Sequence, residues 1–266
     1  MKFADFTTCI LLPALFSHRV HSIIEVGGYH IADSCTHYTV NGQTMATSVY
    51  FAIQRLQDLI RTKVIHDIDA KPTTNGYKAF FKTESNKPIV KDLLTRVANG
   101  DTFLDRCLVA PTSITIDCVA PYVLEGQADR YFDLCNHGSG GMVAFFMSDF
   151  PNIMRMCPQY FALPPRAKLR DCPSVRRNKM AKAPDLILHQ IGVLIHELAH
   201  KYGASGEDEE SAFACKEITE PDEEVMIAEE TFAIQDCVQL EAQKQIKNAQ
   251  NYAYYVSCEL TFSRET

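Results

Sequence analysis

Two histidines and a glutamate are the residues in this sequence best suited to chemistry. His196 and His200 are four positions apart in an apolar stretch, and Glu197 directly follows the first of them. Four positions make slightly more than one α-helical turn, so both imidazoles leave a helix on the same face and can bind one ion together. The spacing therefore predicts a metal site on a helix.

Zinc is the metal that these side chains favour. Neutral imidazole nitrogens bind Zn²⁺ well, and a catalytic zinc keeps an open position for water beside three protein ligands. The metal lowers the pKa of that water from 15.7 to about 7, and a carboxylate beside it can pass its proton to a leaving amine. We predict His196 and His200 as zinc ligands and Glu197 as the general base.

The same pattern also occurs by chance in helices, with both histidines as core residues. Apolar residues surround the pair: Ile187, Leu188, Ile191, Val193, Leu194, Ile195 and Leu198. Imidazoles buried among them are costly without partners, and ligation by a metal explains them better. We expect this helix to begin near Pro184 and Gly203 to end it.

The composition is that of an ordinary globular chain. It has 266 residues, 46% hydrophobic and 22% charged, with a formal net charge of −7. This charge argues against nucleic acid as a partner. Residues 1–22, with Lys2 and a short apolar core, are typical of a secretory signal peptide, and no later segment has the length of a membrane span. We expect one domain over residues 23–266.

Cysteines add to the prediction of export. Ten are present and Cys9 lies in the signal, so nine remain in the mature chain. Disulfides are the expected state of an exported chain, and the odd number leaves one thiol free or paired with another molecule.

Apolar spacing predicts helices over residues 43–65, 77–82, 88–98 and 225–240. Alternation predicts a strand over residues 113–118, a second strand is expected over 142–147, and residues 23–39 form an irregular or extended lead-in. A third zinc ligand has to stand on an element that packs against the metal helix, which favours residues 225–240. Glu229 is the preferred candidate, with Glu230 and Asp208 as alternatives.

Four short blocks together resemble one known family. They are residues 114–118, residues 156–164, the stretch around His196, Glu197 and His200, and the C-terminal residues 248–255. In this order the blocks resemble the deuterolysin or aspzincin metalloendopeptidases, which are secreted zinc enzymes and include a group that cleaves before lysine. The resemblance covers roughly residues 35–258.

The resemblance implies a mostly helical α+β fold, namely a single zincin-like metalloprotease domain with a small sheet, and the same ligands and base as above. The family takes its third ligand from an Asp in a Gly-Thr-x-Asp-x-x-Tyr-Gly block, which this chain lacks. A loose placement puts Glu229 at the Asp, Phe232 at the Tyr and Ala233 at the second Gly. The family tyrosine is thought to stabilise the oxyanion.

The leading interpretation is a secreted, monomeric zinc endopeptidase that acts on protein or peptide substrates, without a nucleic-acid or membrane partner. One alternative is a secreted effector or interaction protein that keeps the fold and has weak or no turnover. Another is a secreted binding module without metal.

Overall fold

The helix that carries the histidine pair is α7, which runs from Gln190 to Tyr202. It belongs to a computed structural model that describes residues 22–102, 112–122, 129–136, 142–147, 150–165, 189–204 and 232–262. His189, in an extended conformation, caps α7: its Nδ1 accepts a hydrogen bond from the Gly192 amide at 3.1 Å. The expected start near Pro184 is therefore wrong, because the cap lies at His189. The expected stop is confirmed, since Gly203 ends the helix.

The burial of α7 explains why this segment is held in place. Ile191, Leu194, Ile195 and Leu198 are at most 3% exposed, whereas His196, Glu197 and His200 are half-buried. The apolar residues anchor one side of the helix in the core and leave the polar group on the more open side. The expected apolar setting of the pair is confirmed for these residues, while Ile187 and Leu188 lie outside the described residues.

The strands form a mixed five-stranded sheet in the order β1-β2-β5-β7-β6. Two antiparallel pairs, β1 with β2 and β6 with β7, flank the parallel pairs β2 with β5 and β5 with β7. The strands are β1 (Ser22–Val26), β2 (Tyr29–Ala32), β5 (Thr115–Cys118), β6 (Ala144–Met147) and β7 (Phe150–Met156), and a small separate hairpin joins β3 (Thr39–Val40) to β4 (Gln43–Thr44).

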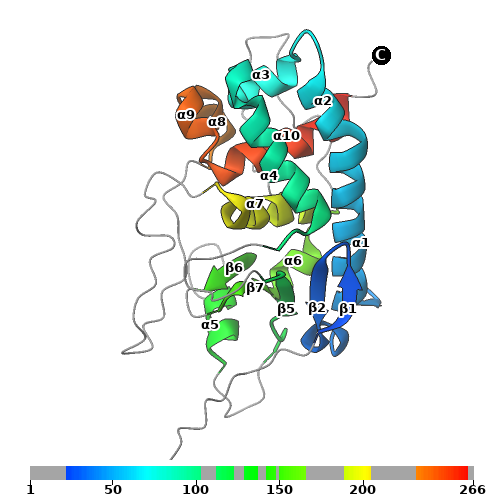
Figure 1. Cartoon of the computed structure of the whole chain (residues 1–266). Coiled ribbons are helices and arrows are strands. Elements are labelled where there is room, and N and C mark those ends of the chain that lie inside the picture. Colours follow the sequence, from blue (N-terminus) through cyan, green and yellow to red (C-terminus); the bar gives the residue numbers. More distant parts are fainter. Residues whose placement is uncertain are drawn as a thin grey trace, which may run out of the picture.

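Most helices lie on one side of this sheet (Figure 1). They are α1 (Met45–Leu59), α2 (Ile65–Asp69), α3 (Asn75–Phe81), α4 (Lys87–Asn99), α6 (Pro158–Ala162), α7, α8 (Ile234–Gln239), α9 (Ala242–Gln245) and α10 (Ala249–Phe262). A π-helical turn at Ile60–Val64 joins α1 to α2, and 3₁₀ turns occur at Asp33–Thr36 and Glu84–Asn86. In Figure 1, α7 lies across the middle, between the sheet below and α4 and α10 above.

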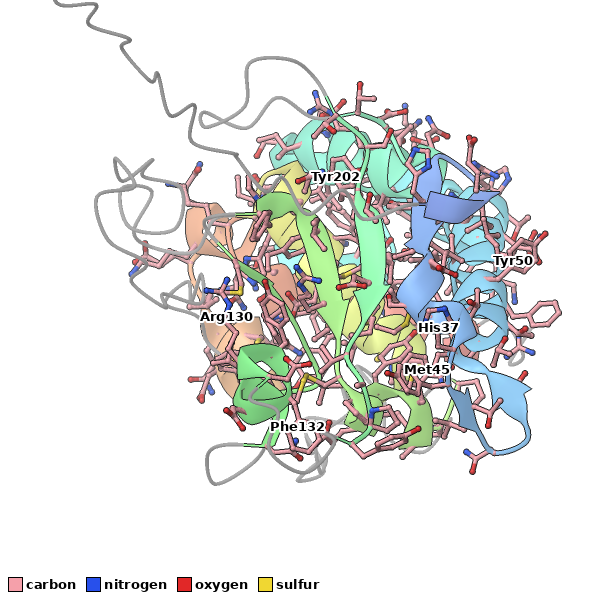
Figure 2. The ribbon with its side chains drawn as sticks, turned by 90° about the horizontal axis from the view of Figure 1, so that it is seen from below. His37, Met45, Tyr50, Arg130, Phe132 and Tyr202 are labelled. Carbon is pink, nitrogen blue, oxygen red and sulfur yellow. A yellow bond between two sulfur atoms is a disulfide. The ribbon has the colours of Figure 1, made fainter. Side chains whose placement is uncertain are left out.

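Each face of the sheet has its own core. Ile116, Phe146 and Met154 belong to the large core that includes the helices, whereas Phe145 and Met147 pack in a smaller cluster beside α5 (Arg130–Asn136). Alternation along the strands produces this division. Figure 2 looks up at the sheet and shows Arg130 and Phe132 of α5 at one side and His37 and Met45 at the other.

A buried ion pair joins the two central parallel strands. Asp117 of β5 and Arg155 of β7 are register partners, and their carboxylate and guanidinium form a salt bridge at 9% and 6% residue exposure. The Arg155 guanidinium also lies 4.1 Å from the centre of the Tyr131 ring on α5. The pair therefore links the sheet to the helix that covers its second face.

Disulfides tie the sheet to its surroundings, as expected. Cys35 is bonded to Cys118 across 83 positions, and Cys135 of α5 is bonded to Cys157. Cys258 is also disulfide-bonded. Cys237 keeps its thiol, and its sulfur accepts a hydrogen bond from the Asn248 amide at 3.4 Å. Cys107, Cys172 and Cys215 lie outside the described residues.

Several expected elements are confirmed. The predicted α+β class, mostly helical with a small sheet and disulfides, is confirmed, as are the helices at α1, α3 and α4 and the strands at β5 and β6. The lead-in after residue 22 is more ordered than expected, because it forms β1 and β2. Within the described part of the chain, no helix is long and apolar enough to cross a membrane.

One predicted helix is partly wrong, and several elements were not predicted. Residues 232 and 233 are not helical, and α8 begins only at Ile234, so a continuous helix over 225–240 is excluded. The unpredicted elements are α5, α6, α9, α10, β7 and the hairpin of β3 and β4. The predicted signal peptide lies outside the described residues except for Ser22, the first residue of β1.

Helix α10 is joined to α7 by a buried chain of hydrogen bonds. Because His189 Nδ1 accepts from the Gly192 amide, its Nε2 carries the hydrogen and donates to Ser257 Oγ at 2.9 Å. Ser257 in turn donates to the Ala253 carbonyl at 2.5 Å. Burial lowers the pKa of His189 to about 4 from an ordinary 6.5, so the imidazole is neutral in the folded protein.

This chain of bonds predicts a loss of stability in mild acid. Between pH 6.5 and about 4 the unfolded chain binds a proton at His189 more readily than the folded chain does, so the free energy of unfolding falls as the pH falls. His189→Ser keeps an N-cap acceptor but does not titrate. Urea unfolding at pH 7 and pH 4.5 should show wild type losing about 2–3 kcal/mol more than this variant between the two pH values. Equal losses would contradict the prediction.

Candidate metal site

The two imidazoles of α7 point toward each other. His196 Nε2 and His200 Nε2 are 3.3 Å apart, and the ring planes are nearly perpendicular, with an interplanar angle of 87°. The prediction that a spacing of four brings both rings to one side of a helix is confirmed. Glu197, from the same turn of the helix, is half-buried like the two histidines.

Hydrogen bonds on the far side of each ring decide which nitrogens carry hydrogen. His200 Nδ1 lies 2.9 Å from the Ala204 carbonyl oxygen, and His196 Nδ1 lies 2.9 Å from Gln250 Oε1. Both oxygens can only accept, so in neutral rings each Nδ1 donates its hydrogen. A lone pair is then left on each Nε2, and the two lone pairs converge.

This arrangement fits a tetrahedral metal ion. Two converging lone pairs repel each other unless a cation or a proton lies between them. Two Zn–N bonds of about 2.05 Å that span the observed 3.3 Å would meet at an angle of about 107°, close to tetrahedral. Metal-binding histidines in proteins almost always donate the other ring hydrogen to a carbonyl, carboxylate or similar acceptor, as His196 and His200 do here.

The turn after α7 supplies one of these acceptors. Gly203 adopts φ +136°, and the amides of Gly203 and Ala204 both donate to the Ala199 carbonyl, at 3.1 and 2.8 Å. The reversal brings the Ala204 carbonyl back to His200. Ala204 itself is fully buried, so its carbonyl is shielded from competing water.

Helix α10 supplies the other acceptor. Gln250 is fully buried in its first turn, with its carbonyl oxygen on His196 and its amide nitrogen without a hydrogen-bond partner in the described residues. An orphaned buried donor is costly. Only the oxygen of the Gln250 amide has a hydrogen-bond partner among the described residues, so the side chain is held by His196 or by the packing around it.

Phe232 lies directly against the site. Its ring faces the His196 ring at an interplanar angle of 29°, with the centroids 5.8 Å apart, and its side chain is 55% exposed. The loose placement of Phe232 at the family's tyrosine position thus puts a ring beside His196, but one without a hydroxyl. Ala233 follows it as the N-cap of α8.

The three candidates for the third ligand, Glu229, Glu230 and Asp208, lie outside the described residues. Within the described ranges, no group of three or more His, Cys, Asp or Glu side chains could hold a metal ion. The described residues therefore include two of the three predicted ligands, His196 and His200.

A cavity of about 230 Å³ lies elsewhere, where α1, α6 and the start of α7 meet. Its lining includes Met45, Phe51, Arg55, Phe161 and Gln190, but none of His196, Glu197 and His200. The histidine pair therefore lies outside this cavity.

Three contributors to the site were not predicted from the sequence: His189, the Ala204 carbonyl and Gln250. Gln250 belongs to the C-terminal block that carried the family resemblance, but no role was predicted for it. A recognisable signal was present, because polar residues interrupt an otherwise apolar C-terminal helix: Gln250, Asn251 and Ser257. A carbonyl contribution such as that of Ala204 leaves no signal in residue types.

Comparisons with known proteins add little to this geometry. No family model and no curated protein matches the chain. Among solved structures, the chain is similar to a zinc peptidase from Grifola frondosa, with a TM-score of 0.44 and 13% sequence identity, covering 79% of this chain and 93% of that chain. A likeness of this degree carries no argument about fold, family or activity.

The role of Gln250 can be tested by its two nearest substitutions. Gln250→Leu removes the acceptor for His196 Nδ1, and zinc affinity should fall about 10–100-fold, the usual cost of losing such a partner. Gln250→Glu keeps an acceptor and should bind zinc at least as tightly as wild type. Competition with a chromogenic chelator measures both affinities. If the two variants weaken binding equally, Gln250 acts through packing and not through its oxygen.

Proposed function

We propose that this protein is a secreted zinc-dependent endopeptidase. The observation that carries the proposal is the pair of Nε2 atoms 3.3 Å apart, with each Nδ1 held by an acceptor. Export is supported by the disulfides Cys35–Cys118 and Cys135–Cys157, which persist in oxidising compartments. A zincin-like domain over residues 23–266 is part of the same proposal.

His196, His200 and Glu197 each have a role in the proposed reaction. His196 and His200 bind zinc through Nε2, and their Nδ1 hydrogens keep both rings in the required tautomer. Zinc, when bound, acidifies a water molecule and polarises the carbonyl of the peptide bond. The Glu197 carboxylate accepts the proton of that water and then donates it to the amine that leaves. The substrate is a protein or peptide, and the enzyme acts as a monomer.

Glu197→Gln tests this role. It removes the base while leaving both imidazoles and their acceptors in place, so zinc content should stay at one per chain. The rate of casein cleavage should fall about 10²–10⁴-fold, the usual contribution of a general base. Zinc content by atomic absorption and casein cleavage by the mature protein provide the two measurements. Equal cleavage by wild type and variant would refute the mechanism.

We propose Glu229 as the third ligand. Phe232, three positions later, has its ring against His196. Three residues span at most about 10–11 Å, so the chain is long enough to bring Glu229 or Glu230 to the histidine pair. Asp208 is four positions past Ala204, whose carbonyl meets His200, and the chain is long enough there too. Chain length thus admits all three carboxylates.

Glu229→Ala, compared with Glu230→Ala and Asp208→Ala, separates these candidates. Zinc affinity should fall more than about 100-fold in Glu229→Ala, since a direct ligand contributes more than the outer partners, which contribute about 10–100-fold. The other two variants should stay within a few-fold of wild type. Circular dichroism controls for folding. If another of the three shows the large loss, the third ligand is that residue.

A second function is favoured by one observation. Phe232 has no hydroxyl where the resemblance places an oxyanion-stabilising tyrosine, and losing one such donor typically costs about 10²–10³ in rate. A secreted interaction protein that binds zinc but has weak or no turnover would show this feature. Stoichiometric zinc together with no cleavage of any unfolded protein would favour this function over the endopeptidase.

A further inference from the structure

Phe232 is unusual among the exposed apolar side chains of the described residues. Only Phe51, Ile89, Tyr122 and Phe232 are large and exposed there, and Phe232 is the one that touches the histidine pair. One ring face covers His196, while more than half of the side chain remains open to solvent. Exposed apolar surface at a binding site is commonly used for recognition.

Helix α10 holds the backbone of Phe232. Tyr254 donates a hydrogen bond from its hydroxyl to the Phe232 carbonyl at 2.7 Å. Tyr254 is itself only 3% exposed, and its ring stacks on that of Phe80, with centroids 6.1 Å apart and an interplanar angle of 20°. A non-helical residue is thus held by a rigid part of the core.

The same helix supports His196 from a second direction. Gln250 lies four positions before Tyr254, and residues four apart share one side of a helix. Gln250 holds the Nδ1 edge of His196, while Tyr254 holds the residue whose ring covers the His196 face. The spacing between the metal ligand and the aromatic ring is therefore set by one helix.

We propose that Phe232 is a specificity-determining residue: its exposed ring forms an apolar wall beside the metal site and selects substrates with an apolar side chain next to the bond that is cleaved. Tyr254 is the positioning residue that holds this wall. The inference rests on the proposed zinc site. Because the wall contacts a substrate from one side only, a large apolar side chain should be preferred over glycine by about 10-fold. This is the low end of the roughly 10–200-fold range known for apolar pockets.

Binding of two small probes tests the proposal without requiring turnover. N-acetyl-leucine hydroxamate and N-acetyl-glycine hydroxamate share the zinc-binding group and differ in the side chain. Titration calorimetry on the zinc-loaded full mature chain should show the leucine probe binding about 10-fold more tightly than the glycine probe. In Phe232→Ala this ratio should fall below about 2, with the glycine probe unchanged. The matched control Phe51→Ala, an exposed Phe outside the site, should keep the wild-type ratio.

Tyr254→Phe tests the positioning role. It keeps the ring that stacks on Phe80 and removes only the hydroxyl that holds the Phe232 carbonyl. The leucine-to-glycine ratio should fall to an intermediate value while zinc affinity and the glycine probe are unaffected. A merely structural role would instead weaken both probes together.

The outcomes separate this inference from the function on which it rests. Equal binding of both probes to wild type overturns the inference, and so does an unchanged leucine-to-glycine ratio in Phe232→Ala. In either case, tight binding of the glycine probe would still support the proposed zinc site. A preference for a lysine hydroxamate over the leucine probe also overturns it. Failure of the chain to bind zinc or either probe overturns both proposals.

Discussion

The buried contact between α7 and α10 is the interaction on which the rest of the site depends. It is polar at two points, His189 with Ser257 and His196 with Gln250, and the core around it is mostly apolar. Buried polar groups are tolerated only when their partners are in register, so these bonds allow few relative positions of the two helices. Apolar packing alone would permit α7 to slide or rotate, and a small rotation would carry the His196 ring away from Gln250.

The remaining elements keep this helix pair in place. The sheet lies beneath α7 and packs its Phe146 ring under the Lys201 ammonium at 4.7 Å, while the Tyr202 hydroxyl donates to the Asp101 carbonyl just beyond α4. The Asp117–Arg155 pair and the Cys135–Cys157 disulfide fix the far side of the sheet, while the Cys35–Cys118 disulfide lies in the large core on the side of the helices. The polar group on α7 therefore stands on a support that is held on both faces.

The sequence was most informative where one physical rule dominates. Helical spacing was enough for α1, α4 and the joint orientation of His196 and His200, because periodicity depends only on local geometry. It failed for β7, because Pro151 and Arg155 are not typical of a buried strand. The charge of Arg155 is neutralised by Asp117, which lies on another strand. It also misplaced the start of α7, because a histidine served as the cap. Gln250 meets His196 across 54 positions of the chain and Tyr254 meets Phe232 across 22, and no local rule detects contacts at such separations.

The turn at Gly203 has a consequence for how this site can change. A methyl group at that position would find room, since the nearest neighbour, Leu93 Cδ1, is 4.0 Å away, but a φ of +136° is rarely adopted by residues with a side chain. The acceptor for His200 is the Ala204 carbonyl oxygen, and the backbone conformation of Gly203, not a side chain, places it there. Scanning the chain by truncating side chains would overlook this acceptor, and any replacement of the glycine would disturb a histidine that it never touches.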